Sequence, residues 1–361
     1  MIRARDFLKK IDPYQPGKPI EEVARQLNLT GEIIKLASNE NPLGASPLAL
    51  QAIGKAAKEA YLYPDDNCFY FRKKLAAKLG VESENIFVAN GSVEILPLAT
   101  LAYLDPELSA IGSQSAFIWF KIAVRIADGE LIEVPMKNYC HDLQGMLKAI
   151  RPNTRLIYIA NPNNPTGTIV TKQEVDELFR KVPDHVLVIM DEAYYEYIDN
   201  PHYPDSFKYL REGKNILILR TFSKIYGLAG VRLGYGIARP EIIASLSKLR
   251  ISFNVNRLSQ IAGTAALDDD QHVRRGKDVN DTGKEFLYEA YQKMGLFYLP
   301  TYANFIFVDF ARDSQAVFEA LQQKGIITRT IKEYGFPHAL RITIGTDAQN
   351  HKLIKALKNA F

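Results

Sequence analysis

The fold is decided by three apolar runs: RLIYIA at residues 155–160, VLVIM at 186–190 and ILIL at 216–219. Each run is short and continuous, which is typical of a strand buried on both faces. A helix is expected between the first two runs, because TKQEVDELFRKV places Thr171 and Glu174 at the spacing of a capping box. Such strands alternating with helices predict an α/β fold with a mainly parallel central sheet.

The pattern continues outward from these strands in both directions. Towards the N-terminus, helical periodicity covers residues 47–60 and 68–79, and a further helix is expected to begin near Gly91 and Ser92. After about residue 250 long helices and separate apolar strands follow. The expected elements there are helices over 256–268 and 272–294, the strand FIFVDF, a helix over 314–323, the strand LRITIG and a final helix. This change predicts a second, smaller α+β domain that closes on the first.

The composition is that of an ordinary globular protein. Of its 361 residues, 47% are hydrophobic and 24% are charged, and the net charge of +4 is too small and dispersed to invoke nucleic acid or a membrane. The N-terminus does not have the pattern of a secretory signal, and no apolar stretch reaches the roughly 20 residues that cross a bilayer. Cys68 and Cys140 match neither a disulfide framework nor a metal pair, so a cytoplasmic location is expected.

Unusual polar sequences follow the three strands, at the point where each strand ends. They are NPNNPTG at 161–167, DEAYYEY at 191–197 and TFSK at 221–224. Because the carboxyl ends of parallel strands open into one crevice, an Asn, an Asp with a Tyr, and a Ser-Lys pair are expected to converge. Each sequence alone has a simpler interpretation, as a turn, a helix cap or a solvated lysine. Their occurrence at three successive strand ends favours a functional site.

A lysine that faces a carboxylate across a dry cleft suits pyridoxal phosphate. The lysine forms a Schiff base with the carbonyl group, and the carboxylate keeps the pyridine nitrogen protonated so that the ring acts as an electron sink. For the phosphate, the Asn-Gly-Ser sequence at 90–92 before an apolar helix offers backbone N–H groups. Ser223 and Arg232 can add a hydroxyl and a guanidinium. Phe117 is available to cover the pyridine face, with core packing as its alternative.

The sequence does not match the motifs of other common cofactor-binding or catalytic sites. The glycines of GVRLGYG at 230–236 are not followed by a third at position 239, which is Arg, so no dinucleotide fingerprint is present. GKN at 213–215 is not a Walker loop, and the sequence contains neither HExxH nor GxSxG. The six histidines have no metal-ligand spacing, so no metal is expected.

Several motifs that extend along the chain carry a resemblance. They are DPYQPGKP (12–19), NENPLG (39–44), YPD (63–65), NPNNPTG, DEAYYEY, RTFSKIYGLAGVRLGY (220–235), FNVN and LRITIGT (340–346). Together they resemble the histidinol-phosphate aminotransferases, which are fold-type I pyridoxal-phosphate enzymes of the aspartate aminotransferase superfamily. The resemblance implies an N-terminal arm with part of the small domain at 1–40, a large cofactor-binding domain at 41–250 and a small C-terminal domain at 251–361.

The resemblance also implies roles for single residues. Lys224 would form the internal aldimine and move the proton of transamination, and Asp191 would pair with the pyridine nitrogen. Asn164 and Tyr194 would hydrogen-bond the phenolic oxygen of the cofactor, which keeps the aldimine pKa low enough for an amine to attack near neutral pH. Phe117 would stack on the ring. The phosphate would be held by Gly91, Ser92, Val93, Thr221, Ser223, Arg232 and, from the neighbouring subunit of a homodimer, Tyr63.

On the substrate side the resemblance points to two arginines and a tyrosine. Arg341 would grip a substrate carboxylate and, with Arg329, the substrate phosphate as well, because a planar guanidinium suits both anions. Tyr14 would be a third phosphate contact, or else an aromatic residue that packs on the small domain.

Three positions depart from the family pattern. Val93 stands where an acidic residue is common, which removes one side-chain interaction but leaves backbone donation intact. Gln114 lies in IGSQSAF, where a Pro-containing turn is usual, and Trp119 stands where smaller residues or Tyr often occur. These changes fall near the ring and the substrate wall, so they bear on the choice of substrate and not on the cofactor.

We therefore expect a cytoplasmic, homodimeric aminotransferase that exchanges the amino group between L-histidinol phosphate and 2-oxoglutarate in histidine biosynthesis. Transamination of phenylalanine or tyrosine and decarboxylation of threonine phosphate are alternatives on the same scaffold. A cofactor-binding regulator without catalysis is the alternative from another class of protein. The presence of Lys224, Asp191, Tyr194 and Arg232 argues against it, because a regulator has no need of the Schiff-base lysine.

Overall fold

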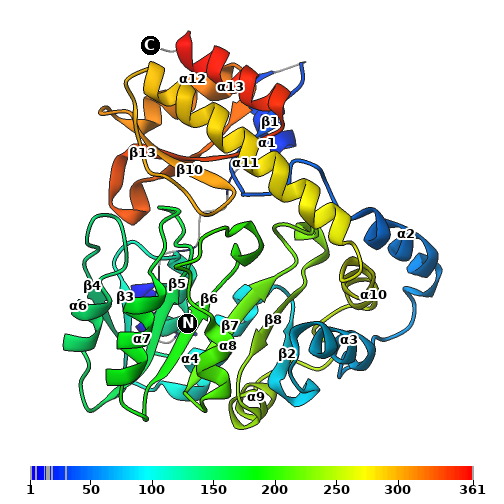
Figure 1. Cartoon of the computed structure of the whole chain (residues 1–361), viewed down its shortest axis with the longest axis vertical. Helices are drawn as coiled ribbons and strands as arrows, with labels where there is room; N and C mark the ends of the chain where they lie inside the picture. The colour runs from blue at the N-terminus through cyan, green and yellow to red at the C-terminus, as the bar shows by residue number, and fades with distance from the viewer. Residues whose placement is uncertain are drawn as a thin grey trace.

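A seven-stranded sheet forms the centre of the molecule (Figure 1). The computed structural model describes residues 2–4, 6–11, 13, 17, 19–28 and 31–359. In order across the sheet, the strands are β2 (Ile86–Ala89), β8 (Gly234–Ile237), β7 (Ile216–Thr221), β6 (Leu187–Asp191), β5 (Thr154–Ala160), β3 (Ser109–Ser113) and β4 (Glu130–Val134). The strands β3 to β7 are parallel, and β8 runs antiparallel to both of its neighbours. The predicted α/β fold with a mainly parallel sheet is confirmed.

Helices cover both faces of this sheet. In β5, Ile157 and Ile159 belong to one hydrophobic cluster, whereas Leu156 and Tyr158 belong to the cluster on the opposite face. The first face carries α2 (Pro47–Ala56), α3 (Phe69–Leu79), α6 (Leu143–Lys148), α7 (Lys172–Lys181), α8 (Ser206–Arg211) and α10 (Arg257–Ala266). The other carries α4 (Ile95–Tyr103), α5 (Ile118–Ile126) and α9 (Pro240–Ser247). Burial on both faces explains why the central strands read as continuous apolar runs.

A second sheet, antiparallel and four-stranded, lies with three helices at the top of Figure 1. Its strands, in order, are β12 (Arg329–Ile331), β13 (Phe336–Thr343), β10 (Phe305–Asp309) and β9 (Phe297–Tyr298). The helices are α11 (Asp270–Lys293), α12 (Ser314–Gln323) and α13 (Asp347–Lys358). Ile306 and Leu340 of the sheet share a core with Leu287, Leu321 and Leu353 of the helices. This α+β unit contains the elements expected after about residue 270, whereas the helix expected over 256–268 is α10, which packs on the large sheet and not in this unit.

The N-terminal segment joins this second unit. Its helix α1 spans Ile20–Leu27, and the short strand β1 (Ile34–Lys35) pairs in parallel with β11 (Ile326–Ile327). The division of the chain at residues 40 and 250 stays a prediction.

The sequence patterns do not reveal β3 and β8, because small residues replace apolar ones there. In β3, a Cβ on Gly112 would press against the ring of Phe120, 3.2 Å away. In β8, a Cβ on Gly234 would collide with the backbone of Ser92. Both strands therefore need glycine for close packing, and the second glycine brings the Gly91–Ser92 turn onto the sheet.

The sequence correctly predicts where a helix begins when a capping box marks its first turn. The helix α7 begins at Lys172, as expected from the pair Thr171 and Glu174, which form the capping box with each other's backbone N–H groups.

Cys68 and Cys140 are free. Among the described residues, no helix combines the length and the apolar character that spanning a bilayer requires.

Candidate active site

A cavity lies where the central strands of the large sheet end and the small sheet begins. Ala160, Asp191 and Thr221, the last residues of β5, β6 and β7, line it together with Arg329 of β12 and Arg341 of β13. The sequence-predicted site residues in its wall are Gly91, Ser92, Val93, Phe117, Asn164, Asp191, Tyr194, Thr221, Ser223, Lys224, Arg232, Arg329 and Arg341. The three strand ends thus converge as the sequence predicts.

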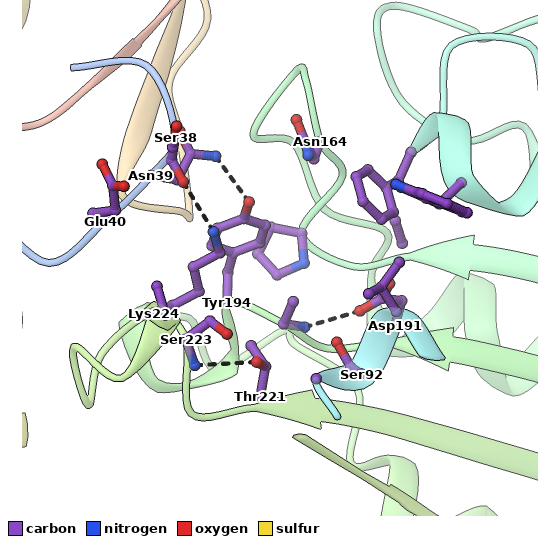
Figure 2. A pocket seen from close by; sticks show the side chains of 18 of the residues that line it. Ser38, Asn39, Glu40, Ser92, Asn164, Asp191, Tyr194, Thr221, Ser223 and Lys224 are labelled. Carbon is purple, nitrogen blue, oxygen red and sulfur yellow. Dashed lines mark hydrogen bonds between the residues drawn. The ribbon is translucent and has the colours of Figure 1, made fainter. Parts of the chain in front are cut away.

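Lys224 follows β7 and reaches into this cavity. Its Nζ donates to the backbone oxygen of Ser38 at 3.1 Å (Figure 2). Burial, assisted by the positive charge of Arg341, lowers the pKa of Lys224 to about 7. A lysine with such a pKa is in part a free amine at neutral pH, so it can act as a nucleophile or carry a proton.

Asp191 ends β6 and is buried, with two fixed donors. The hydroxyl of Tyr158 donates to Oδ2 at 2.8 Å, and the backbone N–H of Ala193 donates to Oδ1 at 3.2 Å. Burial raises the pKa of Asp191 to about 6, although both hydrogen bonds act in the opposite direction. Such a carboxylate is ready to pair with a cationic nitrogen brought into the cavity.

Hydrogen bonds from the N-terminal segment and from the small sheet hold Tyr194 and Asn164, respectively. Asn39 Nδ2 donates to the Tyr194 hydroxyl at 2.9 Å (Figure 2). Arg341 donates from Nη1 to Asn164 Oδ1 at 2.7 Å and from Nη2 to the backbone oxygen of Ala37 at 2.5 Å. Its Nε is buried and has no partner among the described residues. The guanidinium is therefore fixed at one edge and retains donors for an anion.

A compact set of donors surrounds the Gly91–Ser92 turn. Gly91 has φ of +85°, and a Cβ there would collide with the guanidinium of Arg232. Arg232 Nη1 lies 3.5 Å from Ser223 Oγ, and the Ser223 N–H donates to Thr221 Oγ1 at 3.1 Å (Figure 2). A guanidinium, hydroxyls and the first backbone N–H groups of a helix form a typical phosphate site.

The opposite wall is aromatic and contains the second arginine. Phe117, at the start of α5, Trp119 and Tyr334 line the cavity. Arg329 forms an ion pair with Glu333 at 2.7 Å. Phe117 also packs on the hydrophobic cluster of the sheet face that carries α4, α5 and α9. It therefore both lines the cavity and packs on the core.

Two of the residues singled out from the sequence, Tyr63 and Gln114, do not line the cavity. Tyr63 is 80% exposed, with its ring 4.8 Å from that of Phe253. Gln114 borders a neighbouring hollow and not the cavity itself. Tyr14 lies outside the described residues.

Other residues of the site are not found by the sequence motifs. Ser38 contacts Lys224 and Asn39 contacts Tyr194; Asn39 is the first residue of NENPLG, and Ser38 directly precedes that motif. Tyr158 is a hydroxyl-bearing residue inside an otherwise apolar strand. Their partners are distant in sequence, so local patterns could not identify their contacts.

Comparison with known proteins agrees with the fold. The family model "Aminotransferase class I and II" matches residues 31–357. Aspartate aminotransferase from Thermus thermophilus, solved with maleate, has the same fold, with a TM-score of 0.86 at 19% identity over 100% of both chains. The chain belongs to the class I and II aminotransferases and, with it, to the fold-type I enzymes.

Relatives over the full length are more specific. The chain is 50% identical to histidinol-phosphate aminotransferase from Moorella thermoacetica, over 99% of this chain and 92% of the relative. It is 45% identical to that of Caldicellulosiruptor saccharolyticus, over 99% of both. Histidinol-phosphate aminotransferase from Sinorhizobium meliloti, solved in complex with pyridoxal-5'-phosphate, has a TM-score of 0.92 at 28% identity, over 100% of this chain and 98% of that one. The resemblance carried by the motifs is confirmed.

Proposed function

We propose that this aminotransferase exchanges the amino group between L-histidinol phosphate and 2-oxoglutarate, giving imidazole-acetol phosphate and L-glutamate in histidine biosynthesis. The observation that carries the proposal is the presence of two guanidinium groups, Arg329 and Arg341, in the cavity that contains Lys224. One substrate presents carboxylates and the other a phosphate, and a guanidinium binds both. The names of the full-length relatives support the same reaction.

The donors of the cavity fit pyridoxal phosphate as the cofactor. A glycine is required at position 91, because a Cβ would fill the space beside the Arg232 guanidinium. Gly91, Ser92, Val93, Thr221, Ser223 and Arg232 would hold the phosphate. When bound, the cofactor supplies a carbonyl group that condenses with amines and a ring that accepts electrons.

The residues around the ring would control protons. Asp191 would hold a proton on the pyridine nitrogen, and the Tyr194 hydroxyl and Asn164 would hydrogen-bond the phenolic oxygen. Lys224 Nζ, with its low pKa, would bind the cofactor covalently and would then move a proton between the substrate carbon that bears the amino group and the carbon of the cofactor's carbonyl group. Phe117 would cover the ring and exclude water from it.

The substrate wall combines charge with aromatic surface. Arg341 would bind the carboxylate of glutamate, and Arg329, paired with Glu333, would join it in binding the phosphate of histidinol phosphate. Tyr14 would add a third phosphate contact. Trp119 and Tyr334 would pack on the imidazole. The same aromatic wall favours phenylalanine or tyrosine as the alternative amine substrates.

A homodimer is part of the proposal, with a cytoplasmic location. Large side chains are exposed on two neighbouring segments. One segment carries Tyr63, which is 80% exposed, and Tyr70, which is 77% exposed; the other carries Ile251, which is 77% exposed. The segments are tied together, since Arg250 donates to both oxygens of Asp66 at 2.9 and 2.6 Å. Such a surface suits a second copy of the chain, whose Tyr63 would then reach the phosphate. Two free cysteines suit a reducing compartment.

A substrate panel tests the reaction. With protein loaded with pyridoxal phosphate, amino transfer to 2-oxoglutarate is measured from L-histidinol phosphate and from phenylalanine. We expect a kcat/KM at least about a hundredfold higher for histidinol phosphate, equivalent to about 2.7 kcal/mol. Equal values would identify a broad aromatic aminotransferase, and carbon dioxide released from threonine phosphate would identify the decarboxylase.

A mixing experiment tests the shared site. Chains carrying Lys224→Ala and chains carrying Tyr63→Phe are unfolded together and refolded, so that mixed dimers have one unaltered site. In a random equimolar mixture we expect the mixed dimers to contribute about one quarter of the unmodified activity, in addition to the residual activity of the Tyr63→Phe dimers. No gain over the separate variants would contradict a site shared between subunits.

A further inference from the structure

A hydroxyl at the back of the cavity has no part in the roles above. Tyr158, on β5, is fully buried, and it borders the cavity. Its hydroxyl lies 2.8 Å from Asp191 Oδ2, on the neighbouring strand β6. The remaining oxygen of that carboxylate accepts from the backbone N–H of Ala193. Each oxygen of the carboxylate thus accepts one hydrogen bond from the described part of the chain, one from a side chain and one from a backbone group.

The position of this hydroxyl is fixed by packing. The ring of Tyr158 stacks on Phe120, with the centroids 4.6 Å apart and the planes 12° from parallel. Ala160 pairs with Asp191 in the sheet, and Tyr158 lies two residues earlier on the same face of β5. Backbone and stacking together direct the O–H at the carboxylate, so little freedom is lost in making the bond.

The bond has a chemical consequence for the carboxylate. Burial disfavours the charge of Asp191, whereas a donor hydrogen bond favours it. Burial also raises the pKa of Tyr158 well above its usual value, so the phenol stays a donor. Tyr158 therefore opposes the protonation of Asp191 that burial alone would promote.

A purely structural role is the competing explanation, because any buried hydroxyl needs a partner. The chain contains a matched example of that role. Tyr209 is buried, stacks on Phe179 at 4.2 Å and 20°, and donates to Asp176 Oδ1 at 2.8 Å. This pair joins α7 and α8 and does not line the cavity.

We propose that Tyr158 is a positioning residue, whose O–H keeps the Asp191 carboxylate ionised and directed at the place where the ring nitrogen of pyridoxal phosphate would lie. The inference rests on the proposed function, since it requires that cofactor in this cavity. Without the hydroxyl, Asp191 would be a stronger base and would draw the shared proton away from the ring nitrogen. The effect is therefore specific to the nitrogen atom of the cofactor.

Cofactor binding tests this without reference to turnover. Dissociation constants are measured for pyridoxal phosphate and for its deaza analogue, in which C–H replaces the ring nitrogen, in the unmodified protein and in Tyr158→Phe and Tyr209→Phe. We expect Tyr158→Phe to bind pyridoxal phosphate about tenfold more weakly, which is the change that about 1.36 kcal/mol of lost stabilisation of the charged carboxylate gives. The deaza analogue should bind to Tyr158→Phe and to the unmodified protein with the same dissociation constant. Tyr209→Phe should bind both ligands with the dissociation constants of the unmodified protein.

Nitrogen-15 NMR of the labelled cofactor gives a second readout. In Tyr158→Phe the ring-nitrogen signal should move towards that of neutral pyridine, and in Tyr209→Phe it should not move. If pyridoxal phosphate fails to bind the unmodified protein, the proposed function falls and this inference with it. If it binds, but the two variants give the same constants and the same nitrogen signal, only the inference is overturned.

A second variant protects the test against misfolding, which circular dichroism detects. Phe120→Leu removes the stacking partner and keeps the Tyr158 hydroxyl. It should move the nitrogen signal in the same direction by a smaller amount, and an unmoved signal there would overturn the inference.

Discussion

Replacing Arg341 by lysine tests the substrate side of the site while keeping its positive charge. The guanidinium is anchored by Asn164 and the backbone of Ala37, and its Nε is buried without a partner. A carboxylate can take two parallel hydrogen bonds from such a fork, whereas an ammonium group offers one at a time. The variant should therefore lose one charge-assisted bond, worth about 1.5–3 kcal/mol. Dividing by about 1.36 kcal/mol per factor of ten gives a loss of about 10- to 150-fold.

Steady-state kinetics would measure this loss in kcat/KM for glutamate and for histidinol phosphate. Arg211→Lys, which alters an exposed pair with Asp205, should change neither value. The kinetics are measured at saturating pyridoxal phosphate, because Arg341 also holds Asn164, which is proposed to contact the cofactor. A kcat/KM within threefold of the unmodified value for both substrates would refute the assignment of Arg341 to substrate binding.

Three further predictions concern the lysine and the buried charges. Lys224→Ala should abolish turnover and the visible absorbance of lysine-bound cofactor, and retained turnover would contradict covalent binding there. Because only the neutral amine attacks, the rate of cofactor attachment in stopped-flow experiments should rise with pH and level off above about 7, whereas a midpoint near 10 would contradict the low pKa of Lys224. Arg220→Met should lower the free energy of unfolding in urea by about 3–5 kcal/mol, since it leaves Glu192 buried and unpaired. The exposed control Arg211→Met should cost less than about 1 kcal/mol, and equal losses would contradict that reasoning.

Much of the site could be predicted from the sequence, because its residues directly follow the predicted strands. Asn164, Asp191 and Lys224 follow three apolar runs that need no long-range information to identify. Once the sheet is parallel, its topology brings their side chains to one edge. The capped helix α7 between two of the strands made the parallel arrangement the natural prediction.

Contacts that close the site from other parts of the chain could not be predicted in this way. Tyr158 has the sequence of a core residue, and only the register of β5 on β6 puts its hydroxyl at Asp191. Strands β3 and β8 were missed because glycine there serves close packing and lowers the apolar signal. Tyr63 gives a further case, since its proposed role requires a second chain.

Asn39 shows how the two sheets are joined at the site. It adopts φ of +57°, a left-handed conformation that asparagine tolerates better than most residues. Its side chain donates to the Tyr194 hydroxyl at 2.9 Å and accepts from Thr343 Oγ1 at 3.0 Å, while its backbone oxygen accepts from Asn304 Nδ2 at 3.0 Å. Thr343 and Asn304 lie at β13 and β10, whereas Tyr194 follows β6. Because Arg341 also belongs to β13, one strand fixes both the arginine proposed to bind substrate and, through Asn39, the tyrosine proposed to contact the cofactor. A shift of the small sheet would therefore move both groups together.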